Sequence, residues 1–308
     1  MGNLLNPKSK IKDVTPKAVS KIRVLDPACG SGSFLLGAYQ YLLDWHRDWY
    51  VANDPEKWAT GRSPALYQSG KSETDNWRLT TAERRRILLN NIYGVDIDPQ
   101  AVEVTKLSLL LKVLEGESEQ TIVKQLKLFH ERALPDLGNN IKCGNSLIGT
   151  DFYNINVGAG LKPAPTTIDD EELRKVNPFD WETEFPEIMK PAPAGREQGT
   201  GGFDAVIGNP PYVRQEGLGT LKEYLQQKYT VYHGMADLYA YFIEKGVSLL
   251  RDKGIFGYIV ANKWMRANYG EPLRKWLKRQ CIAQIVDFGD LPVFQQATTY
   301  PCILVIGK

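Results

Sequence analysis

The sequence predicts an α/β fold with a mostly parallel, doubly wound sheet. Short apolar strands alternate with helical patterns along the 308 residues, and this alternation is typical of parallel strands joined by crossover helices. The first strand leads through a glycine-rich turn into a long helix, which is the opening of an α/β unit. Ligands of such sheets bind beyond the carboxyl ends of the strands, and the motifs of this chain follow predicted strand ends.

The first half of the chain supplies three strands and two long helices. Residues 50–90 are polar and charged and predict an insertion with some helix. Pro99 suits the first turn of the second helix, because the N–H that proline lacks has no helical partner there. The predicted elements are a strand at Lys21–Asp26, a turn at 27–32, a helix at Ser33–Trp49, a strand at Ile92–Asp96, a helix from Pro99 to Leu114 and a strand at Asn140–Cys143.

The second half supplies four more strands. Residues 151–202 are rich in proline, glycine and acidic residues, and the tetrapeptide K-P-A-P occurs there twice, so we expect a surface loop. The remaining elements are strands at Phe203–Gly208, Ile255–Val260, Ile282–Phe288 and Cys302–Ile306, with helices at Met235–Leu250 and Glu271–Lys278.

The composition is that of an ordinary globular protein, with 43% hydrophobic and 24% charged residues. No apolar run approaches the roughly 20 residues that span a bilayer, so we expect no membrane partner. Four scattered cysteines without metal-ligand spacing predict reduced thiols in a cytoplasmic protein and no metal site. The net charge of +2 gives little support to a nucleic-acid partner unless basic side chains cluster in space.

The turn after the first strand reads D-P-A-C-G-S-G, from Asp26 to Gly32. Gly30 and Gly32 allow positive φ and close approach of a ligand to the backbone. The turn has neither the G-x-G-x-x-G pattern of dinucleotide sites nor a phosphate-binding loop. An acidic strand end followed by two close glycines suits a ligand with an ammonium group and no phosphate, such as S-adenosylmethionine, whose methionine end Asp26 would attract.

A second acidic residue, Asp96, ends the next strand in G-V-D-I-D-P. A carboxylate at this place can accept both ribose hydroxyl protons of a nucleoside. The alternative is a purely structural role as a helix cap, and for Asp98, directly before Pro99, that is the favoured interpretation.

The motif Asn209-Pro210-Pro211-Tyr212 follows the fourth strand directly. Two prolines stiffen the turn, so the asparagine amide oxygen and a main-chain carbonyl are presented at a fixed separation and can accept both protons of an amino group. The lone pair of an aromatic amine then becomes available for attack on a methyl group, a reaction that needs positioning above all. Tyr212 offers a face on which a flipped base can stack. The alternative is a turn without chemistry.

These two motifs in this order resemble the N6-adenine DNA methyltransferases of the gamma arrangement. More closely, the chain resembles the methyltransferase part of the type IIG (Eco57I-like) restriction-modification family. The resemblance extends to C-G-N-S-L-I-G at 143–149 and N-K-W-M-R-A-N-Y-G at 262–270. It implies a Rossmann-like class I methyltransferase with a seven-stranded sheet ending in an antiparallel hairpin, and a single catalytic domain over residues 1–308 with inserts at about 50–90 and 151–202.

The resemblance also implies roles for single residues. Those expected at the cofactor are Asp26, Ala28, Gly30 and Gly32 at the methionine end, Asp96 at the ribose, and Asn145 at the adenine, where the family usually has an acid. Those expected at the target amine are Asn209 and the Pro210 carbonyl, with Pro211 completing the rigid turn and Tyr212 stacking on the flipped adenine. Phe294 best matches the family's second aromatic, with Tyr300 as the other candidate and core packing as the alternative for Phe294.

The implied activity is methyl transfer from S-adenosylmethionine to adenine N6 in double-stranded DNA, within a restriction-modification or phage-defence system. The family's upstream cofactor-binding helix, its target-recognition region and a nuclease pattern are not expected in these residues, so a separate chain is an expected partner. The alternatives are a protein glutamine or RNA methyltransferase, or an inactive cofactor-binding or DNA-binding half of a split complex.

Several basic side chains are candidates for DNA phosphate. Those that follow the strand ends are Arg214, Lys222, Lys228, Lys263 and Arg266. For the cluster Arg84–Arg86 the favoured interpretation is a solvated helix face. Cys302 opens an apolar strand, which favours a buried thiol over a nucleophile.

Overall fold

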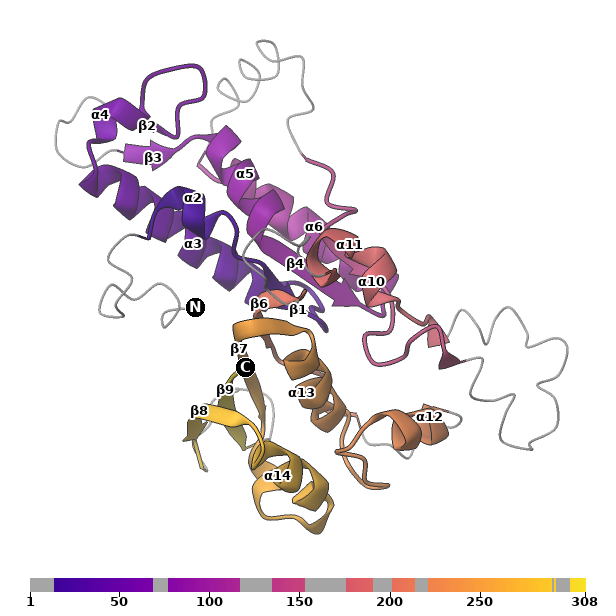
Figure 1. Ribbon diagram of the computed structural model, residues 1–308. Coiled ribbons are helices and arrows are strands. Elements are labelled where there is room, and N and C mark those ends of the chain that lie inside the picture. Colours follow the sequence, from indigo (N-terminus) through magenta and orange to yellow (C-terminus); the bar gives the residue numbers. More distant parts are fainter. Residues whose placement is uncertain are drawn as a thin grey trace, which may run out of the picture.

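The computed structural model describes residues 14–68, 77–116, 135–152, 176–190, 201–213, 221–289, 291 and 300–308. Seven strands form one sheet in the order β5-β4-β1-β6-β7-β9-β8, with a separate two-stranded sheet of β2 and β3. In the seven-stranded sheet, neighbouring strands are parallel except that β9 runs antiparallel to both β7 and β8; β2 and β3 are antiparallel to each other. This confirms the predicted doubly wound, seven-stranded sheet with its C-terminal antiparallel hairpin (Figure 1).

The strands of the main sheet are β1 Val24–Asp26, β4 Ile92–Asp96, β5 Ile141–Cys143, β6 Phe203–Gly208, β7 Leu250–Ala261, β8 Cys281–Asp287 and β9 Pro301–Gly307; β2 is Leu66–Gln68 and β3 is Trp77–Leu79. The helices are α2 Pro16–Val19, α3 Ser33–Ala52, α4 Pro55–Trp58, α5 Thr81–Asn91, α6 Pro99–Leu114, α10 Trp181–Glu184, α11 Pro186–Met189, α12 Leu221–Lys228, α13 Tyr239–Ser248 and α14 Glu271–Leu277, with 3-10 turns at Asn262–Met265 and Asn268–Gly270.

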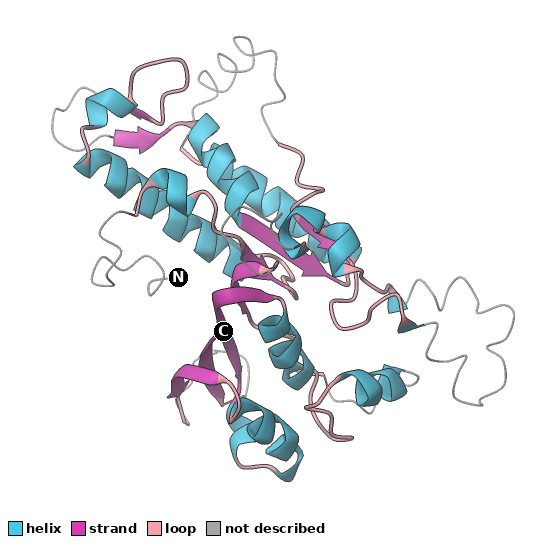
Figure 2. Ribbon diagram, viewed as in Figure 1, coloured by secondary structure: helices cyan, strands magenta, loops and turns pink. Residues whose placement is uncertain are grey.

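Helices cover both faces of the sheet (Figure 2). On one face α3, α5 and α6 pack through Leu35, Leu42, Ile87 and Leu109, all fully buried. Phe34, near the start of α3, is 38% exposed. On the other face α13 packs against β7. Each face of the sheet carries its own hydrophobic cluster, and adjacent residues of one strand point into opposite clusters, as the pleat of a strand requires.

The segment 176–190 corrects the prediction that residues 151–202 form a surface loop throughout. Phe179, Trp181 and Phe185 are buried, and Phe179 packs edge to face against Trp181. Trp181 and Phe185 each pack edge to face against Phe203. Composition averaged over the whole stretch hid these aromatics, which lie between the two K-P-A-P repeats. Asn177 also accepts a hydrogen bond from the backbone N–H of Asn145 at 2.7 Å, so the segment supports a strand end.

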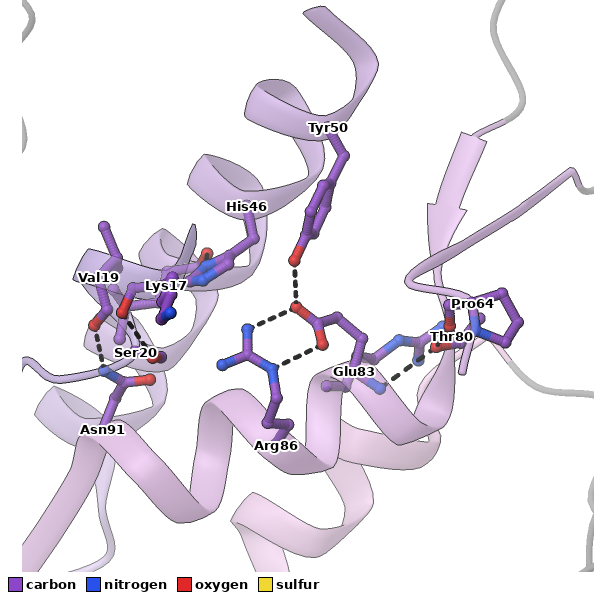
Figure 3. Close-up of polar contacts among 12 residues, drawn as sticks. Lys17, Val19, Ser20, His46, Tyr50, Pro64, Thr80, Glu83, Arg86 and Asn91 are labelled. Carbon is purple, nitrogen blue, oxygen red and sulfur yellow. Dashed lines mark hydrogen bonds and ion pairs between the residues drawn. The ribbon is translucent and has the colours of Figure 1, made fainter. Parts of the chain in front are cut away.

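The insertion is shorter than the predicted range 50–90, because helix α5 at the end of that range packs against both α3 and α6 as part of the main fold. The Glu83 carboxylate accepts hydrogen bonds from Tyr50 at 2.7 Å and from Arg86 at 2.6 Å, and Figure 3 shows the three side chains pointing toward one another. Arg84 is buried and donates to the carbonyls of Val113 and Glu115. The prediction of a solvated arginine face was therefore wrong for Arg84, whose guanidinium joins α5 to the end of α6. Arg86 binds the same Glu83 carboxylate that Tyr50 of α3 contacts.

The C-terminal third follows the predicted order with shifted boundaries. The helix expected at Met235–Leu250 begins at Tyr239, and β7 is longer than expected because it starts at Leu250. Cys302 is fully buried, as predicted. No helix in the described ranges is long and apolar enough to cross a membrane. Within those same ranges no group of three or more His, Cys, Asp or Glu side chains could hold a metal ion.

Candidate active site at the carboxyl edge of the sheet

The glycine turn after β1 adopts the backbone geometry that its sequence predicts. Gly30 has φ +52° and Gly32 has φ +84°, a region that side chains disfavour. A Cβ on Gly30 would meet nothing within 4 Å, so the space beside this residue is open. At Gly32 the neighbour is Thr105 of α6, whose hydroxyl donates to the Gly30 carbonyl at 2.7 Å. Thr105 thus fixes the turn, and no motif indicated it.

Asp96, at the end of β4, is tied to the same turn. One carboxylate oxygen accepts the Gly30 N–H at 2.7 Å and the other accepts the Asp98 N–H at 3.0 Å. Each oxygen keeps a further lone pair, so the group can still accept protons from a ligand. Asp98 caps α6 through the Gln100 N–H, as predicted.

Asp26 of the predicted site is buried, at 2% exposure. Its carboxylate accepts the Ala28 N–H at 3.0 Å. Burial raises the pKa of Asp26 to about 7, the Ala28 hydrogen bond opposes that rise, and the nearby Asp96 charge adds to it. A cation placed beside a buried carboxyl whose pKa lies near 7 stabilises the ionised form of that carboxyl.

Asn209 follows β6 at the same edge, and its amide oxygen is buried without a donor among the described residues. A buried acceptor that lacks a partner lowers the stability of the folded state by about 1–3 kcal/mol. The unpartnered Asn209 oxygen therefore destabilises the fold of the unliganded chain. Gly208, one residue earlier, leaves room for the Asp26 carboxylate, which would lie 2.8 Å from a Cβ placed there. The ends of β1 and β6 therefore pack closely.

A pocket of about 400 Å³ brings these strand ends together. Its walls include the predicted site residues Ala28, Gly30, Asp96, Asn145, Asn209 and Pro211. Its volume lies within the range of small-molecule sites. Asp26, Gly32, Pro210 and Tyr212 are not part of its walls, but each lies within two residues of one that is.

Comparison with known proteins decides the family, since the Eco57I restriction-modification methylase family matches residues 90–294. The chain belongs to this methylase family. It is 32% identical over 302 residues, 95% of its length, to the type II restriction enzyme and methyltransferase RM.Eco57I of Escherichia coli, of which it covers 26%. It is 25% identical over 320 residues to the adenine-specific methyltransferase BrxX of Escherichia coli O9:H4 (strain HS), covering 87% of this chain and 24% of BrxX.

The fold is shared with a solved structure, a nuclease-deletion mutant of the Type ISP restriction-modification enzyme LlaGI in complex with a DNA substrate mimic. The TM-score is 0.54 at 14% identity, over 98% of this chain and 21% of that one. The chain spans about a quarter of the length of the curated relatives it matches. A methyltransferase fold of this family implies a cofactor of the S-adenosylmethionine type.

Apolar residues of this family member complete the pocket, and the sequence analysis did not identify them. Ile97 follows Asp96 and is 48% exposed at the pocket wall. Opposite walls come from α12 and from the start of α13, through Leu221, Leu225, Leu238 and Phe242. The two pairs are each spaced four apart, which places both members of a pair on one helix face. That spacing was the available signal.

Asn145 and Tyr212 carry additional structural contacts. The Asn145 amide oxygen accepts the Leu147 N–H at 3.1 Å, so it closes its own turn. Tyr212 is 37% exposed, its ring lies 5.9 Å from that of Tyr239, and its hydroxyl donates to the Ile259 carbonyl at 3.4 Å. Phe294 lies outside the described residues, and Tyr300, the other candidate, is 45% exposed.

Proposed function

We propose that this chain transfers a methyl group from S-adenosylmethionine to the N6 amino group of adenine in double-stranded DNA. The observation that carries the proposal is the unpartnered, buried amide oxygen of Asn209 beside a pocket that Asp96 and Gly30 also line. The names of the relatives support the same activity, because one is a restriction enzyme and methyltransferase and another is adenine-specific.

The residues on the β1 and β4 side fit the cofactor. Gly30 leaves open space for close approach, and the nearby Asp26 carboxyl favours a cationic amino group. The Asp96 carboxylate has lone pairs to accept ribose hydroxyl protons. Ile97 and Phe242 offer apolar walls to a planar purine, and Asn145 lies at the end of β5 where it can face the purine amine.

The residues on the β6 side fit the target amine. S-adenosylmethionine supplies an electrophilic methyl group when bound. The Asn209 amide oxygen accepts a hydrogen bond from one N–H of the adenine amine and the Pro210 carbonyl accepts one from the other N–H, which directs the nitrogen lone pair out of the ring plane. Pro210 and Pro211 hold these acceptors in place, and Tyr212 provides a stacking face for an extruded base. No strong base is needed, because the proton leaves to solvent after the nitrogen has gained the methyl group.

We further propose that residues 1–308 form one catalytic domain acting in the cytoplasm on duplex DNA. Its insertions lie around α4, β2 and β3 and within 151–202, leaving α5 and 176–190 in the domain core. Sequence recognition and DNA cleavage would then reside in other regions or in a partner chain, as the length of the relatives suggests.

The test is to incubate the purified chain with radiolabelled S-adenosylmethionine and, separately, duplex DNA, RNA and a protein extract. The expected product is labelled N6-methyldeoxyadenosine, recovered from DNA digested to nucleosides. Label in RNA or in glutamine would contradict the proposal. If no acceptor is labelled, calorimetry with the cofactor separates a chain that binds without transferring from one that binds nothing, and either result rejects autonomous activity.

A further inference from the structure

A second hollow lies at the same edge of the sheet, beyond the ends of β7 and β8. Its volume is about 600 Å³. The walls come from the loop that follows β7, from the end of β8 and from the start of β9: Asn262, Lys263, Met265, Arg266, Ala267, Tyr269, Asp287, Gly289 and Tyr300. This surface, called here the β7-loop pocket, is separate from the pocket that contains Asn209.

The loop is held in shape by polar contacts. Arg274 of α14 donates to the carbonyls of Trp264 and Ala267 at 2.5 and 2.8 Å. Asn262 donates from its backbone to the Tyr300 carbonyl and from its side chain to Asp287, both at 2.8 Å. A binding surface built on such fixed groups loses little entropy when a ligand binds.

Two cations of this pocket have no carboxylate partner among the residues that the structure describes. Lys263 and Arg266 are exposed, and within the described part of the chain neither forms an ion pair. Asp287 also lines the pocket, and its pKa is lowered chiefly by the hydrogen bond from Asn262, then by the Gly289 N–H, with a smaller effect of the Arg266 charge. Its described lining therefore carries two positive charges, on Lys263 and Arg266, and one negative charge, on Asp287, whose carboxylate already accepts hydrogen bonds from Asn262 and Gly289.

Other basic candidates at this edge are engaged or lie elsewhere. Lys228 forms an ion pair with Asp151, and Lys275 forms one with Glu271. Arg214 lies outside the described residues, and Lys222 belongs to α12, beside the Asn209 pocket. Lys263 and Arg266 are thus the pair whose charges remain available on a shaped surface.

Aromatic contacts connect this pocket to the target-amine site. Tyr212 packs against Tyr239 with ring centroids 5.9 Å apart, and burial together with the neighbouring Tyr269 raises the pKa of Tyr239. Tyr212 also reaches Ile259 of β7, three residues before Asn262. Three residues of strand span about 10 Å, and one DNA strand carries a phosphate about every 3.4 Å along the helix axis, so flanking phosphates fall within reach.

We propose that the β7-loop pocket binds the phosphodiester backbone next to the adenine seated at Asn209, with Arg266 and Lys263 as the positioning residues. This inference rests on the proposed function. Their contacts neutralise phosphate and set the register of the strand, and they read no base. Tyr269 and Tyr300 flank the backbone sugar.

The test is the salt dependence of duplex binding by the full chain in the presence of S-adenosylmethionine. Each phosphate contact contributes about 0.9 to the slope of log K against log salt. Arg266→Gln and Lys263→Gln are each expected to reduce the slope by about 0.9, on specific and random duplexes alike. Arg279→Gln is the matched control, because Arg279 precedes β8 and so lies at the opposite edge of the sheet.

The possible results separate the two proposals. Cofactor affinity measured by calorimetry is expected to be equal in the wild type, R266Q, K263Q and R279Q. If the wild type methylates DNA while R266Q and K263Q keep its slope and affinity, the phosphate assignment is wrong and the function stands. An equal loss in R279Q also rejects it, because a general charge effect would then suffice. If the wild type neither binds nor methylates DNA, both proposals fail.

Discussion

At the scale of single residues, the acidic or amide groups at the ends of β1, β4 and β6 differ in how far the protein already satisfies their hydrogen bonds and charge. The Asp96 carboxylate already accepts hydrogen bonds from two backbone N–H groups. Asp26 is buried and has a pKa of about 7. The Asn209 amide oxygen has no donor in the described structure. The sequence could place all three at strand ends. It could not distinguish their states, since these depend on packing from distant segments.

Asp96→Ala is expected to weaken cofactor binding by about 10- to 100-fold. Hydrogen bonds to charged groups contribute about 1.5–3 kcal/mol, and about 1.4 kcal/mol corresponds to tenfold in affinity. Calorimetric titration with S-adenosylmethionine measures the change. The matched control is Asp98→Ala, which removes only the α6 cap, costs about 1 kcal/mol of stability and leaves affinity unchanged. Equal affinities of the Asp96 variant and the wild type would exclude the ribose role.

Asp26 is expected to make the unliganded fold less stable as pH rises. Its pKa is about 7 in the folded chain against 3.8 for the ordinary group, so between these values the native state holds a proton that the unfolded chain has lost. The free energy of unfolding therefore falls through this range. Asp26→Asn removes this pH-dependent contribution. The free energy of unfolding of the variant, measured with urea, should therefore rise relative to that of the wild type by roughly 2 kcal/mol from pH 5 to 7. Parallel pH profiles would contradict the raised pKa.

At the scale of elements, the glycine turn and its helix were predictable, and the helix that fixes them was not. The D-P-A-C-G-S-G motif indicated positive φ at Gly30 and Gly32, which the backbone adopts. The hydrogen bond from Thr105 joins residues 75 positions apart, and no local pattern contains such a contact. The same limitation hid the buried roles of Arg84 and Trp181.

Gly32→Ala is expected to destabilise the chain by about 2 kcal/mol or more. A side chain at positive φ costs about 1–2 kcal/mol, and the new Cβ would lie 2.9 Å from Thr105. Gly37→Ala, in the exposed middle of α3 with nothing within 4 Å of its Cβ, should instead stabilise by about 0.5–1 kcal/mol. Thermal unfolding of both variants decides the matter, and effects of the same sign would show that the turn tolerates a side chain.

At the scale of the whole molecule, the succession of strands and helices along the chain was predictable because periodicity and strand-end motifs agree. The pocket was only partly predictable. Its polar floor comes from motifs, whereas its apolar walls come from α12 and α13, whose positions depend on how β6 and β7 are covered. Low-complexity composition between β5 and β6 concealed the aromatics of 176–190, since an average over 52 residues hides a core segment of 15 residues.

The central claim is that Asn209 binds the reacting amine and does not bind the cofactor. Asn209→Ala should lower the single-turnover rate of methyl transfer to duplex DNA by about 100-fold or more, the cost of removing one preorganised polar group. Its calorimetric affinity for S-adenosylmethionine should remain within about twofold of wild type, since each 1.4 kcal/mol is tenfold and no cofactor contact is removed. Asn53→Ala, at the exposed end of α3, is the matched control. Wild-type transfer rates in the Asn209 variant would contradict the account.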